Sequence, residues 1–190
     1  MTKPHLVGAY GMFWDRSEVD WYPGSGPAAW QLLGRLHQRK PILRVCDFRR
    51  AQGFYILFDD FRASYVGLAR GRYGIGARLR KHSVSKRKVW SRFCWFSFDD
   101  VVDGSLESWS RVHRRAALRN ISSEMVLREC EALLITALGT GDQNQMRFQE
   151  ARRWEQLRRE DFLPGGLGRK AEASGYTDRR LRDLAEQNRR

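Results

Sequence analysis

The feature that most limits how this chain can fold is a strand–turn–strand pattern that runs directly into a helix. Residues 53–58 (Gly-Phe-Tyr-Ile-Leu-Phe) alternate along a strand, 59–63 are polar and turn-like, and 64–68 (Ser-Tyr-Val-Gly-Leu) form a second strand. Two such runs joined by a short polar segment predict a β-hairpin whose side chains alternate between two faces. A helix opened by Gly74-Ile-Gly76 follows, with its apolar residues on one face.

Five more segments show a regular pattern. Strands are predicted at 9–14 and 90–98, and the second has aromatic residues on both faces, so both of its faces should be covered. Helices are predicted at 28–38, 122–138 and 147–159 from the spacing of their apolar residues. Tryptophans are costly to expose, so those near the two ends of the chain should cover the core or form a dimer face: Trp14, Trp21, Trp30 and Trp154.

The helix at 122–138 is marked at both ends, by the favourable N-cap residue Ser122 and by the C-cap residue Gly139. We expect its buried face to be an apolar stripe that also carries one acid, Glu131. A carboxylate on a buried helix face needs an ionic partner or a cation, and the sequence leaves these two interpretations open. The expected stripe consists of Leu127, Cys130, Leu134, Ala137 and Leu138.

The charge of the chain points to a polyanionic partner. Its 190 residues include 35 Lys and Arg against 22 Asp and Glu, a formal net charge of +13. Nucleic acid is the first expectation and an anionic membrane surface the second. Basic residues gather at 70–88 and in the C-terminal third, and most are arginines, which can bind phosphate through paired hydrogen bonds.

The sequence also argues against several other classes of protein. Hydrophobic residues make up 42% of the chain, enough for a folded core. Since no apolar run approaches the roughly 18 residues of a membrane span and no signal peptide is recognisable, we expect no membrane partner and a cytoplasmic location. Cys46, Cys94 and Cys130 are far apart and the histidines show no metal-binding spacing, so a bound metal should be a hard ion held by oxygen.

Five sequence elements occur in an order that is more informative than any of them alone. In chain order they are Gly53-Phe-Tyr55, Tyr65-Val-Gly67, Arg78 with His82 one turn later, Glu131 on a later helix, and Asn144. This order resembles the GIY-YIG nuclease family over roughly residues 50–146. Phe54 and Val66 replace the two isoleucines of the family motifs, and the segment between the second tyrosine and the arginine is slightly long.

The resemblance implies a mixed α/β (α+β) fold with a small three-stranded antiparallel sheet flanked by helices. It divides the chain into an N-terminal extension packed on the core (1–49), a nuclease domain (50–146) and a basic helical extension (147–190). For the end of that last region, a solvated helix and disorder both stay open.

The resemblance also implies hydrolysis of phosphodiester bonds by one divalent metal ion, Mg²⁺, with Mn²⁺ able to substitute. Glu131 is the implied metal ligand, and the nearby Glu129 is the alternative. The ion would polarise the phosphate and stabilise the leaving oxygen, while Arg78 would contact the non-bridging oxygens.

A tyrosine, either Tyr55 or Tyr65, is the implied base that activates water. A phenol has an ordinary pKa of about 10, so nearby positive charge must lower this pKa before the group can act at neutral pH. His82 would assist through a hydrogen bond, and Asn144 would orient the site.

We therefore expect a metal-dependent endonuclease that acts on DNA, and the effector nuclease of a restriction or phage-defence system would be a natural role for such a protein. The alternative is a nucleic-acid-binding subunit of a larger complex that is inactive, or that a protein partner targets or activates. A homodimer also stays open. Further substrate contacts are expected from basic residues around the helix that begins at Gly74: Arg70, Arg72, Arg80, Lys81 and Lys86.

Overall fold

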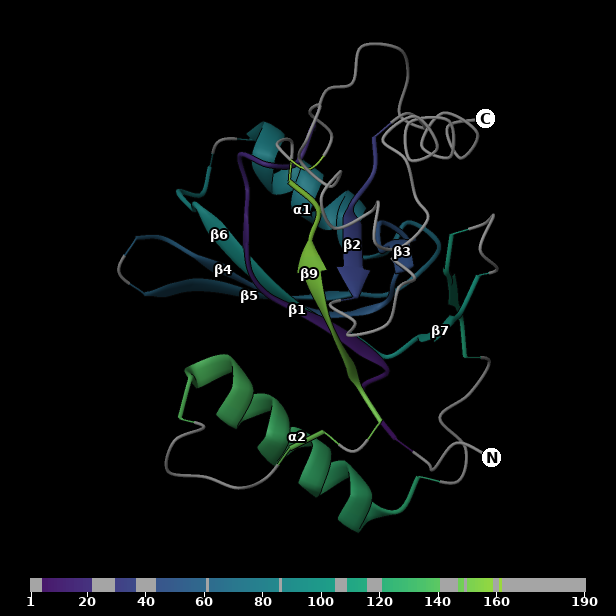
Figure 1. Ribbon diagram of the computed structural model, residues 1–190. Helices are drawn as coiled ribbons and strands as arrows, with labels where there is room; N and C mark the ends of the chain where they lie inside the picture. Colours follow the sequence, from purple (N-terminus) through teal and green to yellow (C-terminus); the bar gives the residue numbers. More distant parts are fainter. Residues whose placement is uncertain are drawn as a thin grey trace.

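A mixed sheet of seven strands forms the centre of the protein, with α1 and α2 on its two sides (Figure 1). This computed structural model describes residues 5–21, 30–36, 44–60, 62–85, 87–104, 109–115, 121–140, 147–148, 150–158 and 161. The strands of the large sheet lie in the order β3-β2-β9-β1-β6-β4-β5, and a separate small sheet pairs β7 with β8.

The elements of the described residues follow in chain order. They are β1 (Ala9–Asp15), β2 (Leu33–Leu36), β3 (Arg44–Asp47), β4 (Gly53–Phe58), β5 (Ala63–Ala69), α1 (Gly74–Ser85), β6 (Arg92–Ser97), β7 (Asp100–Val102), β8 (Arg111–His113), α2 (Ser123–Leu138) and β9 (Arg152–Gln156).

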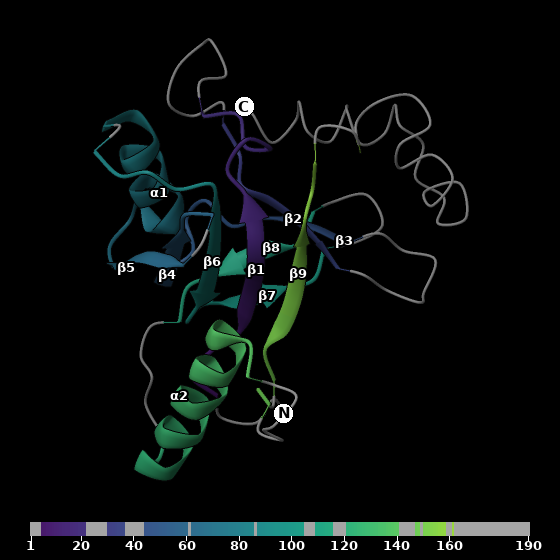
Figure 2. The same cartoon turned by 90° about the vertical axis from the view of Figure 1, so that its left-hand side faces the viewer.

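The expected small three-stranded antiparallel sheet is wrong, because strands from outside the predicted nuclease domain widen the sheet. β5, β4 and β6 are consecutive antiparallel neighbours. β1 continues the sheet beyond β6, and β9 then pairs parallel with β1 and antiparallel with β2. Figure 2 shows β1 and β9 side by side, so segments near the two ends of the chain complete one continuous sheet.

Two predicted helices are wrong for a related reason. Within the segments 28–38 and 147–159, residues 33–36 form β2 and residues 152–156 form β9. Segments of four or five residues are too short for their periodicity to distinguish a strand from a helix, and pairing with neighbouring strands decides between the two. β9 is held by Trp154, whose side chain is completely buried in the core.

The predicted hairpin and the helix that follows it are confirmed as β4, β5 and α1. The predicted strands at 9–14 and 90–98 are likewise confirmed as β1 and β6. The pleat places alternate residues of β4 on opposite faces, so that Tyr55 and Leu57 pack with the α1 side and Ile56 and Phe58 with the other side.

The first turn of α1 lies directly on the chain that precedes β4. The Ile75 N–H donates to the Ala51 carbonyl at 2.7 Å, and the Gly76 N–H donates to the Arg49 carbonyl at 2.9 Å. A Cβ atom at Gly76 would lie 2.8 Å from the Arg49 Cα atom, so a larger residue could not approach this closely. These two N–H groups are therefore occupied within the fold.

α1 and α2 pack on opposite faces of the sheet. Along β6, Phe93 and Trp95 belong to the core on the α1 side, whereas Cys94 and Phe96 pack with Ala137 of α2. Because successive side chains of a strand point to opposite faces, these two sets cannot share one side. Any site that needs groups from both helices would have to reach around the edge of the sheet.

The four tryptophans singled out in the sequence all lie in the core. They are Trp14, Trp21, Trp30 and Trp154, and their exposed fractions are between 0% and 6%. Of the two interpretations that the sequence left open for them, core covering is therefore confirmed. Within the described part of the chain, no helix has the length and apolar character needed to cross a membrane.

Candidate functional site

Tyr55 lies at the centre of a polar cluster on the α1 side of the sheet. Its ring lies across its cross-strand partner Gly67, where an added Cβ atom would come within 2.3 Å of the Tyr55 hydroxyl oxygen. Only glycine leaves room for the ring at this position. Tyr65 lies two residues before Gly67 on β5, so its side chain is on the same face. The two hairpin motifs therefore build one site.

His82 of α1 joins the two tyrosines. The Tyr55 hydroxyl oxygen lies 2.9 Å from Nε2 of His82. The centroid of the Tyr65 ring is 6.1 Å from that of Tyr55 and 5.0 Å from that of His82. The ammonium group of Lys88 lies over the Tyr65 ring, 2.7 Å from its centroid. The structure thus brings together three of the predicted catalytic residues.

The pKa of Tyr55 is raised well above the ordinary value of a phenol. Burial is the main cause, the neighbouring Tyr65 adds to it, and the charge of Arg78 lowers the pKa without cancelling these effects. This direction is opposite to the lowered pKa that we expected for a tyrosine base. Tyr55 is therefore a neutral phenol near pH 7, and its proton is available to an acceptor.

The pKa of His82 is lowered below the ordinary value of a histidine. Burial is the largest cause, followed by the positive charges of Lys88, Arg78 and Lys81. Near pH 7 the imidazole is therefore neutral. A neutral imidazole with its proton on Nδ1 accepts a hydrogen bond at Nε2, and the buried phenol of Tyr55 is the donor that lies within reach.

Glu131, the implied metal ligand, does not lie with this cluster. It is exposed on α2, and α2 packs on the sheet face opposite to Tyr55. The buried acid of α2 is Glu129, which is 2% exposed and accepts a hydrogen bond from the Val7 N–H at 3.1 Å. Among the residues that the structure describes, no three His, Cys, Asp or Glu side chains could jointly hold a metal ion. Among the described residues, the implied metal ligand Glu131 and the tyrosines therefore lie apart, on opposite faces of the sheet.

The expected apolar stripe of α2 is also wrong, because most of it faces away from the sheet. Leu127, Leu134 and Leu138 are 71%, 57% and 72% exposed, and Cys130 is exposed as well. The buried face consists of Glu129, Ala132, Ile135 and Ala137. Small residues allow the helix to approach the sheet closely, and Glu129 finds a backbone donor there, so this face is buried although it is the less apolar one.

The remaining predicted site residues are divided among several places. Arg78 is exposed on α1 close enough to Tyr55 to affect its pKa. The charge of Lys81 lowers the pKa of His82. Arg70 directly follows β5 and is exposed. Lys86 and Asn144 lie outside the described residues.

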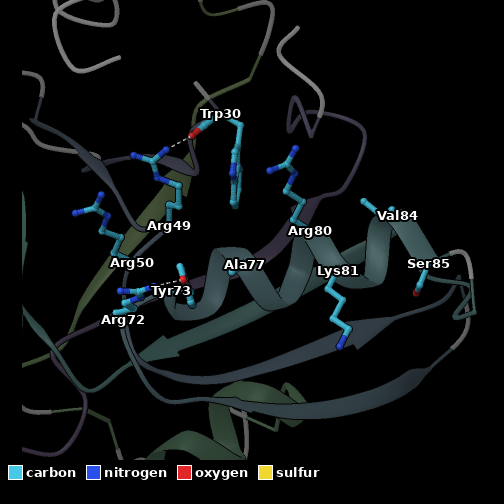
Figure 3. Close-up of a pocket in the computed structure, with 10 residues that line it drawn as sticks. All are labelled: Trp30, Arg49, Arg50, Arg72, Tyr73, Ala77, Arg80, Lys81, Val84 and Ser85. Carbon is cyan, nitrogen blue, oxygen red and sulfur yellow. Dashed lines mark hydrogen bonds between the residues drawn. The ribbon is translucent and has the colours of Figure 1, made fainter. Parts of the chain in front are cut away.

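Three cationic residues that lie at these places were not predicted as site residues from the sequence. Lys88 contacts Tyr65, and its position within the basic run 70–88 was the available signal. Arg49 and Arg50 lie before the hairpin and line a pocket over α1, together with the predicted substrate-binding residues Arg72, Arg80 and Lys81 (Figure 3). Two adjacent arginines directly before a strand were the signal in this case.

No protein-family model, no curated protein and no solved structure matches this chain. The resemblance to GIY-YIG nucleases therefore rests on the five sequence elements and stays a prediction.

Proposed function

We propose that this protein is an endonuclease that hydrolyses phosphodiester bonds in nucleic acid, with DNA as its principal substrate. The observation that carries the proposal is the hydrogen-bonded pair of Tyr55 and His82, which lies beside Tyr65 and near the positive charge of Arg78. Cleavage of a phosphodiester needs a group that removes a proton from water and cations that compensate the phosphate charge. These side chains are suited to both tasks.

In the proposed reaction, Tyr55 and His82 act as a proton relay. As the Tyr55 oxygen takes a proton from the attacking water, the phenolic proton passes to Nε2 of neutral His82. The hydroxide then attacks phosphorus, the bond to the leaving sugar oxygen breaks, and that oxygen takes a proton from solvent while His82 releases its proton to solvent. The guanidinium group of Arg78 binds the non-bridging oxygens. Because the proton moves within a preformed hydrogen bond, the relay does not require a tyrosinate at neutral pH, and the raised pKa of Tyr55 is compatible with it.

A second function, binding of nucleic acid without cleavage, is favoured by the place of Glu131. This residue was expected to hold Mg²⁺ beside the tyrosines, and it is exposed on the opposite side of the sheet. The Mg²⁺ requirement stays a prediction that depends on the sequence resemblance.

A cleavage panel tests both functions. Plasmid, linear duplex, single strand and RNA are incubated with the wild-type protein and with Tyr55→Phe and His82→Asn, in Mg²⁺, in Mn²⁺ or in EDTA. We expect cleavage by the wild type and a loss of about 10²–10⁴-fold in both variants, the usual contribution of general acid–base catalysis. Salt-dependent binding without cleavage by the wild type would establish the second function, and full activity of Tyr55→Phe would contradict the relay.

A further inference from the structure

A pocket of about 770 Å³ lies over α1, and neither Tyr55 nor His82 is among its described lining residues (Figure 3). Its volume is within the range of small-molecule sites, roughly 300–1,000 Å³. Its described lining combines the aromatic rings of Trp30 and Tyr73 with five cationic side chains, and includes no acidic residue among the described ones. The cations are Arg49, Arg50, Arg72, Arg80 and Lys81.

Trp30 forms a fixed aromatic wall with a guanidinium group on either side. It is 4% exposed and packs against Trp21 at a centroid distance of 5.7 Å. The guanidinium carbons of Arg49 and Arg80 lie 6.0 and 5.9 Å from its ring centroid. Arg49 Nη1 donates to the Trp30 carbonyl at 2.7 Å, and Arg80 Nε donates to the Trp21 carbonyl at 3.1 Å. Both charges are thereby held in place at the wall.

The other end of the pocket presents a ring that is open to solvent. Tyr73 is 64% exposed, and the guanidinium carbon of Arg72 lies 4.7 Å from its ring centroid. Ala77 lies on the floor between this end and Trp30 (Figure 3). A small floor residue between an exposed and a fixed aromatic ring leaves room for a flat group.

We infer that this pocket binds a nucleoside phosphate, with the base on the exposed ring of Tyr73 and the phosphate on the arginines. A simple inorganic anion would use the cations and leave the aromatic surface unused. An uncharged apolar molecule would fill the pocket and make no use of its cationic side chains. Aromatic rings stack on any base, and arginine binds phosphate through two parallel hydrogen bonds, so a nucleoside phosphate uses both parts of the lining.

The ligand chemistry has two sources, a free nucleotide or one nucleotide of a single strand. Isothermal titration of the full-length chain distinguishes them with three probes: 5′-AMP, a ten-residue single-stranded oligo-dA, and inorganic phosphate. All proteins carry Tyr55→Phe, so the oligonucleotide is not consumed by the proposed cleavage and the result does not depend on it. Ala77→Phe fills the floor of the pocket, and Arg50→Glu reverses an exposed charge at its rim.

We expect at least a ten-fold weaker binding in Ala77→Phe and in Arg50→Glu, and unchanged binding in Arg62→Glu, a matched charge reversal at the β4–β5 turn. Binding of 5′-AMP as tight as that of oligo-dA identifies a free nucleotide, and binding of oligo-dA alone identifies a strand. The inference is overturned if neither probe binds. It is also overturned if inorganic phosphate binds as tightly as the nucleotide probe that binds, or if Arg62→Glu weakens binding as much as Arg50→Glu.

Discussion

α1 and α2 lie on opposite faces of one sheet, and they differ in which side chains they bury. α1 buries most of its large apolar residues, whereas α2 leaves most of its large apolar residues exposed. α1 buries Ile75 and Leu79, places His82 beside Tyr55 and places Arg80 and Lys81 at the Trp30 pocket. α2 buries a carboxylate and small residues and leaves three leucines exposed. The periodicity of a helix shows that one of its faces is apolar, but the surface available on the partner decides which face is buried.

The comparison also separates two kinds of buried polar group. Tyr55 and His82 lie within hydrogen-bond distance of each other, beside the charges of Arg78, Lys81 and Lys88. Glu129 is bound to the Val7 N–H and lies near Arg115, whose guanidinium also contacts the backbone of the N-terminal segment. The first pair is suited to chemistry, whereas the second group fixes the chain before β1 to α2.

The largest effect is expected when the two sides are compared in catalysis. Tyr55→Phe removes the relay hydroxyl and should lower the rate of DNA cleavage by about 10²–10⁴-fold. Glu131→Gln changes an exposed side chain of α2 and should leave the rate within about two-fold, since it lies far from any group that the relay uses. Initial rates on a labelled duplex, with circular dichroism as the folding control, measure both. An equal loss in Glu131→Gln would place α2 in the active site and break the comparison.

A pair of leucines compares how the helices are packed. Leu79→Ala on α1 removes a completely buried side chain and should lower the free energy of unfolding by about 2–5 kcal/mol. Leu134→Ala on α2 should change it by no more than about 0.5 kcal/mol, because that side chain is 57% exposed. Urea denaturation followed by tryptophan fluorescence gives both values. A cost above 1 kcal/mol for Leu134→Ala would mean that this face is covered in solution.

A pair of acids tests the assignment of the buried face of α2. Glu129→Ala leaves the buried Val7 N–H without its acceptor, which should lower the free energy of unfolding by about 1–3 kcal/mol. Glu131→Ala should cost no more than about 0.5 kcal/mol. The same denaturation experiment compares them. Reversed costs would show that α2 is rotated and that Glu131 faces the sheet, as the sequence predicted.

The smallest effect is a pH dependence that belongs to the α1 side. His82 has a lower pKa in the folded protein than the ordinary 6.5 of an unfolded chain. Below pH 6.5 the unfolded state binds more protons at this residue, so its contribution to stability is complete above pH 6.5 and is lost as the pH falls. The wild type should therefore lose more stability between pH 7.5 and 5.5 than His82→Asn. His113→Asn, at an exposed histidine of β8, is the control, and an identical loss in wild type and His82→Asn would contradict the assignment.

Local patterns predicted part of the fold correctly. Alternation in residues 53–58 and strand-like aromatic runs predicted strands that are confirmed as β1, β4, β5 and β6. The cap residues Ser122 and Gly139 mark the two ends of α2 as expected. The terminal segments were misjudged, because the strands β2 and β9 are short and each gains its hydrogen bonds from partners far away in the chain. No pattern within ten residues contains that information.

The candidate site, like the fold, could be predicted only in part. The sequence by itself determined which side chains share a face of one element, since a two-residue alternation places Tyr65 with Gly67 on β5 and a four-residue step places Arg78 with His82 on α1. That these groups lie beside Tyr55 was implied only by the resemblance. Tertiary structure alone decided the side of the sheet on which α2 packs and the rotation of that helix. These depend on the shape of a surface assembled from distant strands, so Glu129 was buried in place of Glu131, and the Trp30 pocket formed where three separate segments meet.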